Sequence, residues 1–161
     1  MRNSTLCYIE RDGKYLMLHR VKKVNDQNKD KWIGIGGGFE EDESPEDCVR
    51  REALEETGLV LGNVVLRSVV TFVIEGGECE HMFLFKCSDF SGELTDCDEG
   101  VLEWIEKDAL YSLDLWEGDR VFLKKIESEC PFFTLKLVYS RNGILLTAIE
   151  NGSRIIVRRD N

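Results

Sequence analysis

The sequence predicts an α+β sandwich, in which helices pack on a sheet of mixed strand order. Apolar runs typical of strands stand on both sides of two helical segments, an arrangement that favours this class. Their order is not the regular alternation of strand and helix found in βαβ nucleotide-binding folds. The chain has 161 residues, a length that suits one compact domain with a sizeable core. We therefore expect residues 1–161 to form a single domain.

The first part of the chain is predicted to form a β-hairpin followed by a loop. Residues 6–9 and 15–18 are apolar runs, and Asp12-Gly13 between them is a typical hairpin turn. Residues 22–31 are polar and rich in lysine, which indicates a loop. At the three glycines of positions 36–38, the backbone must turn or pass close to another group.

A helix is predicted to begin after Ser44 and to end at Gly58. Ser44 is a favourable N-cap, and Pro45 suits the first helical position. Glu46 and Asp47 place negative charge at the positive end of the helix dipole. Gly58 is a residue that commonly ends a helix, because it adopts left-handed backbone angles without strain. Local signals alone therefore predict both ends of this helix.

The second half of the chain is predicted to add five strands and one more helix. The strands are expected at residues 64–74, 82–87, 101–105, 132–139 and 144–149. Gly76-Gly77 and Asn142-Gly143 separate neighbouring strands as turns. Apolar side chains recur at helical spacing in residues 119–129. Residues 152–161 are basic, and we expect them to form a mobile tail.

The composition is acidic and limits the class of binding partner. Lys and Arg total 21 and Asp and Glu total 31, which gives a net charge of −10 at pH 7. A nucleic-acid polymer is a poor partner for such a chain, since its affinity depends on many Lys and Arg side chains. A small anion can still bind where a divalent metal supplies positive charge. We therefore expect a small-molecule partner.

The cysteines and the apolar segments indicate the compartment. The six cysteines form no C-x-x-C pair, which favours free thiols in a reducing environment. The first five residues contain no signal-peptide core, and nowhere do 18 apolar residues run together. We expect a cytoplasmic protein with no membrane partner.

Three glutamates of the predicted helix point to a metal. Glu52, Glu55 and Glu56 stand at i, i+3 and i+4, which places their carboxylates on one face within about a turn. Three like charges repel one another unless a cation lies among them. Oxygen ligands of this kind suit Mg²⁺ or Mn²⁺. The alternative is that this acidic face is only solvated.

The segment around these glutamates matches a known motif. From Gly37 it reads GGFEEDESPEDCVRREALEETGL. It resembles the Nudix box, G-x5-E-x7-R-E-U-x-E-E-x-G-U with U apolar, at every specified position. The matching residues are Gly37, Glu43, Arg51, Glu52, Ala53, Glu55, Glu56, Gly58 and Leu59. A chance match in a chain of this length is expected less than about once in a million, so the chain is identified as a member of the Nudix superfamily.

This resemblance implies a fold and a chemistry. Nudix proteins are α/β/α sandwiches in which the box forms a loop–helix–loop beside a mixed sheet. Helix glutamates and a backbone carbonyl hold divalent metals on a diphosphate. The implied ligands here are Glu52, Glu55, Glu56 and the carbonyl of Gly36. Arg51 and Glu43 are implied to hold the loop to the helix. Asp42 departs from many members, which have glycine before the first motif glutamate.

Segments outside the box resemble the MutT-type oxidised-purine nucleoside triphosphatases, most of all those of Gram-positive bacteria. The similar runs are L-M-L-H-R-V-K-K-V-N-D, K-W-I-G-I-G-G, D-C-D-E-G-V-L-E-W-I, L-W-E-G-D and P-F-F-T-L-K-L-V-Y. This resemblance extends to about residue 150. It implies that Glu99 is an additional acid that approaches the metals from a loop. The alternative is that Glu99 is an ordinary carboxylate in a turn.

The same resemblance implies a pocket for the base. Trp116 and Asp119 match an aromatic and an acid that line it, and Gly118 replaces a second acid found in the mammalian pattern. A tryptophan face can stack on a purine, and a carboxyl group can hydrogen-bond a base edge. If the layout of the family holds, Thr5 and Cys7 line the same pocket. The alternative is that Trp116 is a core residue.

A basic patch is predicted to meet the phosphates. Arg20, Lys22 and Lys23 stand before the glycine run in an otherwise acidic protein, and such side chains bind triphosphates. Gly37 is implied to contact the substrate beside them. The alternative is that these lysines are solvated like most surface lysines.

The predicted function is Mg²⁺- or Mn²⁺-dependent hydrolysis of a purine nucleoside triphosphate, oxidised or not, to the monophosphate and pyrophosphate. An 8-oxo-dGTP diphosphatase of this kind would serve nucleotide-pool sanitation. Glu56 or Glu99 accepts the proton of the attacking water, with Glu55 and Arg51 beside them. Three alternatives stay open: another diphosphate-linked substrate such as a dinucleoside polyphosphate or ADP-ribose, an isopentenyl diphosphate isomerase, and a non-catalytic nucleotide-binding module. The sequence does not predict an oligomeric state.

Overall fold

The computed structural model describes residues 1–158. Most of its strands form one large sheet, in which the order along the main path is β12-β11-β10-β6-β7-β1-β2-β3. In chain order the elements are β1 (Arg2–Arg11), β2 (Lys14–His19), β3 (Trp32–Ile33), β4 (Ile35–Gly38), α1 (Pro45–Thr57), β5 (Val60–Leu61), β6 (Val65–Ile74), β7 (Cys79–Cys87), β8 (Phe90–Ser91), β9 (Val101–Glu106), the 3₁₀ helix η1 (Lys107–Ser112), α2 (Glu117–Glu127), β10 (Phe133–Tyr139), β11 (Leu145–Glu150) and β12 (Ser153–Val157).

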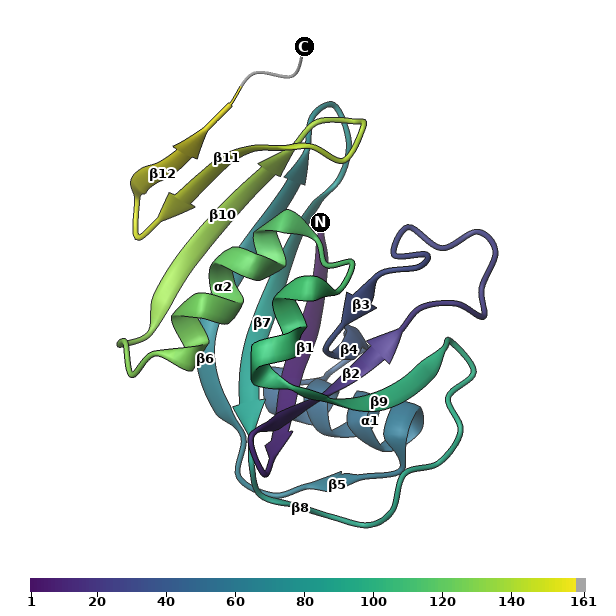
Figure 1. Ribbon diagram of the computed structural model, residues 1–161. Coiled ribbons are helices and arrows are strands. Elements are labelled where there is room, and N and C mark those ends of the chain that lie inside the picture. Colours follow the sequence, from purple (N-terminus) through teal and green to yellow (C-terminus); the bar gives the residue numbers. More distant parts are fainter. Residues whose placement is uncertain (159–161) are drawn as a thin grey trace.

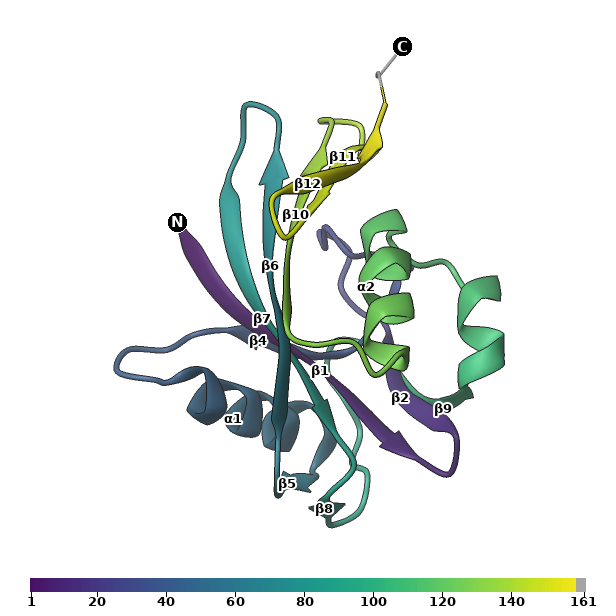
Figure 2. The same cartoon turned by 90° about the vertical axis from the view of Figure 1, so that its left-hand side faces the viewer.

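The layers agree with the predicted α+β sandwich. Helix α1 lies on one side of the sheet, whereas α2 and η1 lie on the other side (Figures 1 and 2). The sheet is mixed, because β1 runs parallel to β7 and β10 runs parallel to β6, while the other pairings are antiparallel. No helix within residues 1–158 is both long enough and apolar enough to cross a membrane. All six cysteines are free thiols, as expected from their spacing.

Strand β1 changes partners along its length. Residues 2–9 pair with β7 on one side, and residues 4–7 pair with β4 on the other. Beyond this point, Glu10 and Arg11 pair with β2 through the predicted hairpin. Asp12 and Gly13 form its turn with positive φ angles, the geometry that matches the twist of paired strands. Strand β1 thus joins the two halves of the sheet.

Side chains of β1 alternate between the two layers, as the pleat of a strand requires. Leu6 and Tyr8 belong to a core cluster under α2 that also includes Phe122. Cys7 and Ile9 belong to a second cluster under α1. The sandwich therefore has two cores, one on each face of the same strand.

Helix α1 has the ends that its sequence predicts. Ser44 accepts a hydrogen bond from the backbone of Asp47, and the Asp47 carboxylate accepts one from the backbone of Ser44. A cap of this kind contributes about 1 kcal/mol. Gly58 ends the helix in the left-handed conformation with a φ of 80°. Val49 and Ala53 are fully buried against the sheet, which fixes the rotation of the helix and so the direction of its carboxylates.

Two segments differ from expectation. The glycines at 36–38 lie in strand β4 and form no turn, because β4 passes so close to β1 that a Cβ on Gly36 would lie 1.9 Å from the carbonyl oxygen of Thr5. The sequence predicted either a turn or a close approach at these glycines, and the structure has the close approach. The prediction of a mobile tail was wrong for residues 153–157, because these residues form β12 and pair with β11. Residues 159–161 of that predicted tail lie outside the described residues.

Candidate active site

Arg51 connects the loop before α1 to the helix. Its guanidinium donates to Glu43 at 2.9 Å and to the carbonyl of Gly38 at 3.0 Å. It also pairs with Glu52 at 2.9 Å and with Glu55 at 3.2 Å. The hydrogen bonds from Arg51 lower the pKa of Glu43 to about 2. One arginine thus fixes the loop and orients two of the three helix glutamates.

Glu52 lies directly against β4. A Cβ on Gly37 would lie 2.5 Å from the Glu52 carboxylate. Any residue other than glycine at this position would therefore displace that carboxylate. Burial raises the pKa of Glu52, while Arg51 opposes that effect. Glu55 differs, since 57% of its side chain is exposed. The three helix glutamates therefore have graded exposure, and Glu55 is the outermost.

Glu56 is the most buried member of the set, with 8% of the residue exposed. Its carboxylate accepts a hydrogen bond from the backbone N–H of Gly36 at 3.3 Å. Burial first, and then the charges of Glu99 and Glu52, raise the pKa of Glu56. Glu99 enters from the loop before β9 and thus completes a group of four carboxylates: Glu52, Glu55, Glu56 and Glu99, called the carboxylate site below.

Basic side chains near Glu99 are engaged by protein groups. Arg20 donates to the Glu99 carboxylate and, at 2.7 Å, to Asp26. Lys22 donates to the carbonyl of Cys97 at 2.6 Å, and Lys23 pairs with Glu99 at 3.0 Å. In this arrangement, Arg20 and Lys22 contact groups of the chain itself, and the predicted phosphate contact of these two residues stays a prediction.

The opposite face of the sheet places Trp116 and Asp119 together. Asp119 is 4% exposed, and burial raises its pKa to about 7 although Lys31 opposes the shift. The charge of Asp119 also raises the pKa values of Tyr8 and Tyr139, after burial as the larger cause. These four residues, Tyr8, Trp116, Asp119 and Tyr139, are called the Asp119 cluster below.

Trp116 is half-buried within this cluster. Its ring meets Tyr139 edge-on at 5.7 Å between centroids, and its indole N–H donates to Asn28 at 2.8 Å. The ammonium of Lys31 lies 4.9 Å from its ring centroid. Trp116 therefore packs on the core and also faces the loop after β2. Each of the two alternatives, a core residue and a residue of a base pocket, describes part of its environment.

Steric contacts explain why position 118 is a glycine. Its N–H donates to the hydroxyl of Tyr139 at 2.8 Å, and a Cβ there would lie 2.5 Å from both that hydroxyl and a methyl of Leu137. The second acid of the mammalian pattern has no room at this position. Asp119 is therefore the acid that this site offers.

The predicted place of Thr5 and Cys7 beside Trp116 is wrong. Thr5 contacts the thiol of Cys48 on α1 at 3.3 Å, and Cys7 belongs to the core under α1. Strand alternation puts Leu6 and Tyr8 on the Trp116 face instead. Sequence reasoning missed Tyr8, whose hydroxyl is buried without a hydrogen-bond partner among residues 1–158. Strand alternation could have indicated Tyr8, because Tyr8 points to the face of β1 opposite to that of Thr5 and Cys7.

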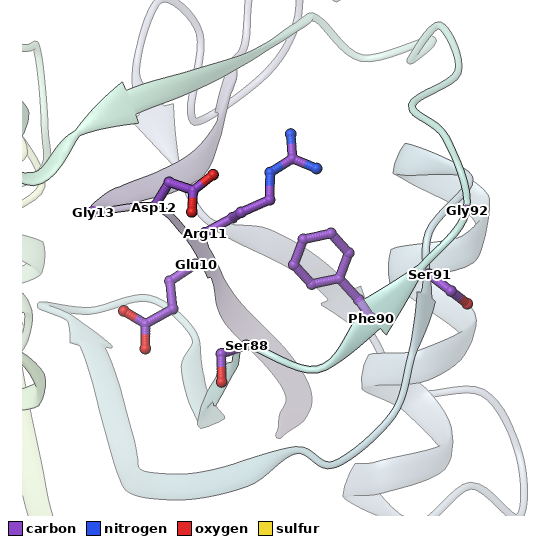
Figure 3. A pocket seen from close by; sticks show the side chains of 8 residues that line it. All are labelled: Glu10, Arg11, Asp12, Gly13, Ser88, Phe90, Ser91 and Gly92. Atoms are coloured by element: carbon purple, nitrogen blue, oxygen red, sulfur yellow. The ribbon is translucent and has the colours of Figure 1, made fainter.

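Two cavities among residues 1–158 lie away from both groups. The larger one has a volume of about 550 Å³ and lies between the β1–β2 turn and β8 (Figure 3). Its lining residues are Glu10, Arg11, Asp12, Gly13, Ser88, Phe90, Ser91 and Gly92. A smaller cavity of about 180 Å³ shares Glu10 and Ser88. Neither includes a member of the carboxylate site or of the Asp119 cluster, so chemistry and not cavity size identifies the candidate site.

Comparison with known families decides the class. A family model described as the NUDIX domain matches residues 1–126. The chain belongs to the Nudix family. It is a hydrolase of MutT type, and Nudix hydrolases act on diphosphate-containing substrates. Glu52, Glu55 and Glu56 are thus the glutamates of a Nudix helix.

Individual Nudix relatives agree with this class. An uncharacterized Nudix hydrolase of Bacillus subtilis, YvcI, is 31% identical over 126 residues, which are 74% of this chain and 75% of that protein. The oxidized purine nucleoside triphosphate hydrolase of Mus musculus is 31% identical over 90 residues, which are 55% of this chain and 58% of that protein. The crystal structure of a MutT protein from Bacillus halodurans superposes with a TM-score of 0.84 at 27% identity, covering 94% of this chain and 98% of that one.

Divalent metal, which Nudix hydrolases generally use, fits the donor chemistry of the carboxylate site. Its four members offer the oxygen ligands that Mg²⁺ and Mn²⁺ prefer. Within residues 1–158, no group of three or more His, Cys, Asp or Glu side chains is placed to enclose a metal ion. Mg²⁺ needs no such cage, since it is commonly held by one or two carboxylates together with waters and substrate phosphates. The raised pKa of Glu56 beside Glu99 marks the point at which a cation would relieve repulsion.

Proposed function

We propose that this Nudix hydrolase cleaves a purine nucleoside triphosphate, oxidised purines included, to the nucleoside monophosphate and pyrophosphate, with Mg²⁺ or Mn²⁺. The observation that supports it most is the burial of Glu56 against Glu52 and Glu99. Burial and the neighbouring charges of Glu99 and Glu52 disfavour the charged form of Glu56, and a divalent cation bound there would favour it.

Each member of the carboxylate site has a proposed task. Glu52, Glu55, Glu56 and the carbonyl of Gly36 hold the metal. When bound, the metal would supply positive charge to the phosphates and lower the pKa of an attacking water. The Glu56–Glu99 pair accepts the proton of that water. Arg51 keeps Glu52 and Glu55 in place through its two ion pairs.

The purine is proposed to lie against the Asp119 cluster. The partly exposed ring of Trp116 offers a stacking face, and stacking contributes about 1–3 kcal/mol per base. With a pKa of about 7, the Asp119 carboxyl can donate or accept a hydrogen bond near neutral pH. The resemblance to a mouse enzyme named for oxidized purine nucleoside triphosphates supports this substrate class. Removal of such nucleotides from the precursor pool is the corresponding role.

The test is product analysis on a nucleotide panel. Purified protein with Mg²⁺ is given 8-oxo-dGTP, dGTP, a dinucleoside polyphosphate and ADP-ribose, and products are separated by chromatography. Monophosphate and pyrophosphate from 8-oxo-dGTP are expected, with the highest kcat/KM on the panel. Glu56→Gln serves as the control for contaminating phosphatases. Nucleoside diphosphate and free phosphate, or faster cleavage of ADP-ribose, would reject the proposed substrate while leaving the Nudix chemistry in place.

A further inference from the structure

Glu99 is held by the loop that follows β2. Arg20 donates to one carboxylate oxygen of Glu99, and Lys23 pairs with the other at 3.0 Å. The backbone N–H of Lys22 donates to the carbonyl of Glu99 at 3.2 Å. The side chain of Arg20 is only 12% exposed, so this contact is shielded from water in a way that most surface ion pairs are not.

Arg20 is itself fixed before it reaches Glu99. Asp26 accepts from its Nε at 2.7 Å, and the backbone N–H of Asn28 donates to the other oxygen of Asp26 at 3.0 Å. The Asp26 carboxylate therefore orients Arg20, and Arg20 in turn orients the Glu99 carboxylate. A planar guanidinium can serve two carboxylates at once, whereas an ammonium is a point charge on a flexible stem.

Glu99 has contacts on two sides. It lies beside the buried Glu56 on one side, and it contacts Arg20 and Lys23 on the other. The segment that contains Glu99 lies between β8 and β9 and has no regular secondary structure of its own. From its outer side, the Glu99 carboxylate is therefore oriented by Arg20 and Lys23.

We propose that Arg20 is a positioning residue that holds Glu99 against Glu56, so that Glu99 reaches the metal of the carboxylate site. This role differs from the phosphate contact predicted from the sequence, and it rests on the proposed function of the site. Arg20 acts through Glu99 and has no contact of its own with the reacting atoms.

The sign of one measurement separates this role from a simple charge effect. Arg20 is a cation close to a cation-binding site. If it acted only through its charge, its removal would strengthen metal binding, because repulsion would be lost. If it positions Glu99, its removal weakens metal binding, because a ligand is lost.

The experiment is a calorimetric titration of the nucleotide-free protein with Mn²⁺ at about 0.15 M salt, where charges more than about 8 Å apart are screened. We expect Glu99→Gln to weaken Mn²⁺ binding about tenfold, at the low end for loss of a metal-site group. Arg20→Ala should weaken it about fivefold, and should have no further effect in the Glu99→Gln background. Lys29→Ala, an exposed lysine in the same loop, is the control that loses the same charge and should bind Mn²⁺ normally.

Arg20→Lys covers the case in which Arg20→Ala does not fold. It keeps the positive charge but cannot serve Asp26 and Glu99 together, so Mn²⁺ binding should again weaken, by about twofold to threefold. Thermal melting confirms that each variant is folded. Normal or tighter Mn²⁺ binding in a folded Arg20 variant overturns the inference, as does an equal loss with and without Glu99. If Glu99→Gln and Glu56→Gln both bind Mn²⁺ normally, the proposed metal site itself is wrong.

Discussion

The two faces of β1 bury polar groups in different ways. On the α1 face, the charged groups are joined to one another, since Arg51 contacts Glu43, Glu52 and Glu55. On the α2 face, burial raises the pKa of Asp119, and the hydroxyl of Tyr8 has no hydrogen-bond partner in the described part of the chain. Buried polar groups are normally satisfied. The difference is that Arg51 holds two glutamates of the carboxylate site through ion pairs, whereas the Asp119 cluster contains a buried hydroxyl without a partner among residues 1–158.

The largest effect is expected from two adjacent glycines on the α1 face. A Cβ on Gly36 would lie 1.9 Å from a backbone oxygen of Thr5, which no side-chain motion relieves. Gly36→Ala should therefore prevent native folding, beyond the roughly 1–3 kcal/mol of ordinary over-packing. A Cβ on Gly37 meets only the end of the Glu52 side chain, so Gly37→Ala should fold and lose most activity. Thermal melting and turnover decide. A stable Gly36→Ala protein would contradict the close β1–β4 approach.

The next effect belongs to the α2 face and depends on pH. The pKa of Asp119 is about 7 in the folded protein, against an ordinary value of 3.8. Between these values the unfolded chain loses its proton while the folded chain keeps it, so stability falls as pH rises from about 4 to 7. The loss amounts to about 4 kcal/mol at 1.36 kcal/mol per pH unit. The Asp119→Asn variant should not show this loss of stability with rising pH. Urea unfolding at pH 4, 5.5 and 7.5 compares the two, and identical pH profiles would refute this account.

Glu56→Gln tests the α1 face without disturbing its packing. Turnover with Mg²⁺ should fall by at least about a hundredfold, as is common on loss of a metal or base group. The melting temperature should not fall, because burial of the charged form disfavours Glu56 in the folded state. Normal turnover in the purified variant would show that Glu56 is not part of the active site.

The smallest effect is expected at Trp116. Trp116→Ala should raise KM for 8-oxo-dGTP more than it lowers kcat, and should reduce the preference for oxidised over normal purine, by the roughly 1–3 kcal/mol of one stacked base. Trp104 is a suitable control, because it is a half-buried tryptophan on β9 that stacks on Phe90 at 5.8 Å. Trp104→Ala should lose stability and keep the substrate ranking. If Trp116→Ala also keeps the ranking, Trp116 serves packing alone.

The sequence predicts the α1 face better than the α2 face for a physical reason. The ends of α1 depend on local signals, Ser44 and Gly58, and the positions of its glutamates follow from helical spacing. The Asp119 cluster draws Tyr8, Trp116 and Tyr139 from segments far apart in the chain. Its composition depends on which face of β1 meets α2, and an error of one residue in parity exchanged Thr5 for its neighbours.

Arg20 was also beyond prediction from local pattern. Its charge was visible, but its partners are Asp26, six residues away, and Glu99, 79 residues away. A basic residue in an acidic chain suggests a bound anion, and only the fold shows that Arg20 also contacts two carboxylates of the protein itself. The strand order is a similar case, since nothing near residues 2–9 indicates β7 as their parallel partner.

That parallel pairing affects how the protein is made. Arg2 pairs with Glu80 and Ile9 with Cys87, a separation of 78 residues in each case. At about 5–20 residues per second, a ribosome needs roughly 4–16 seconds to supply the missing partner. Until then, β1 can pair only with β2, through the turn at Asp12-Gly13, and with β4, and its edge toward β7 stays unpaired. We expect the amides of the β1–β2 hairpin to gain protection before the rest of β1, which pulse-labelled hydrogen exchange during refolding would reveal. Strand β1 thus obtains its longest pairing only after β7 has been synthesised.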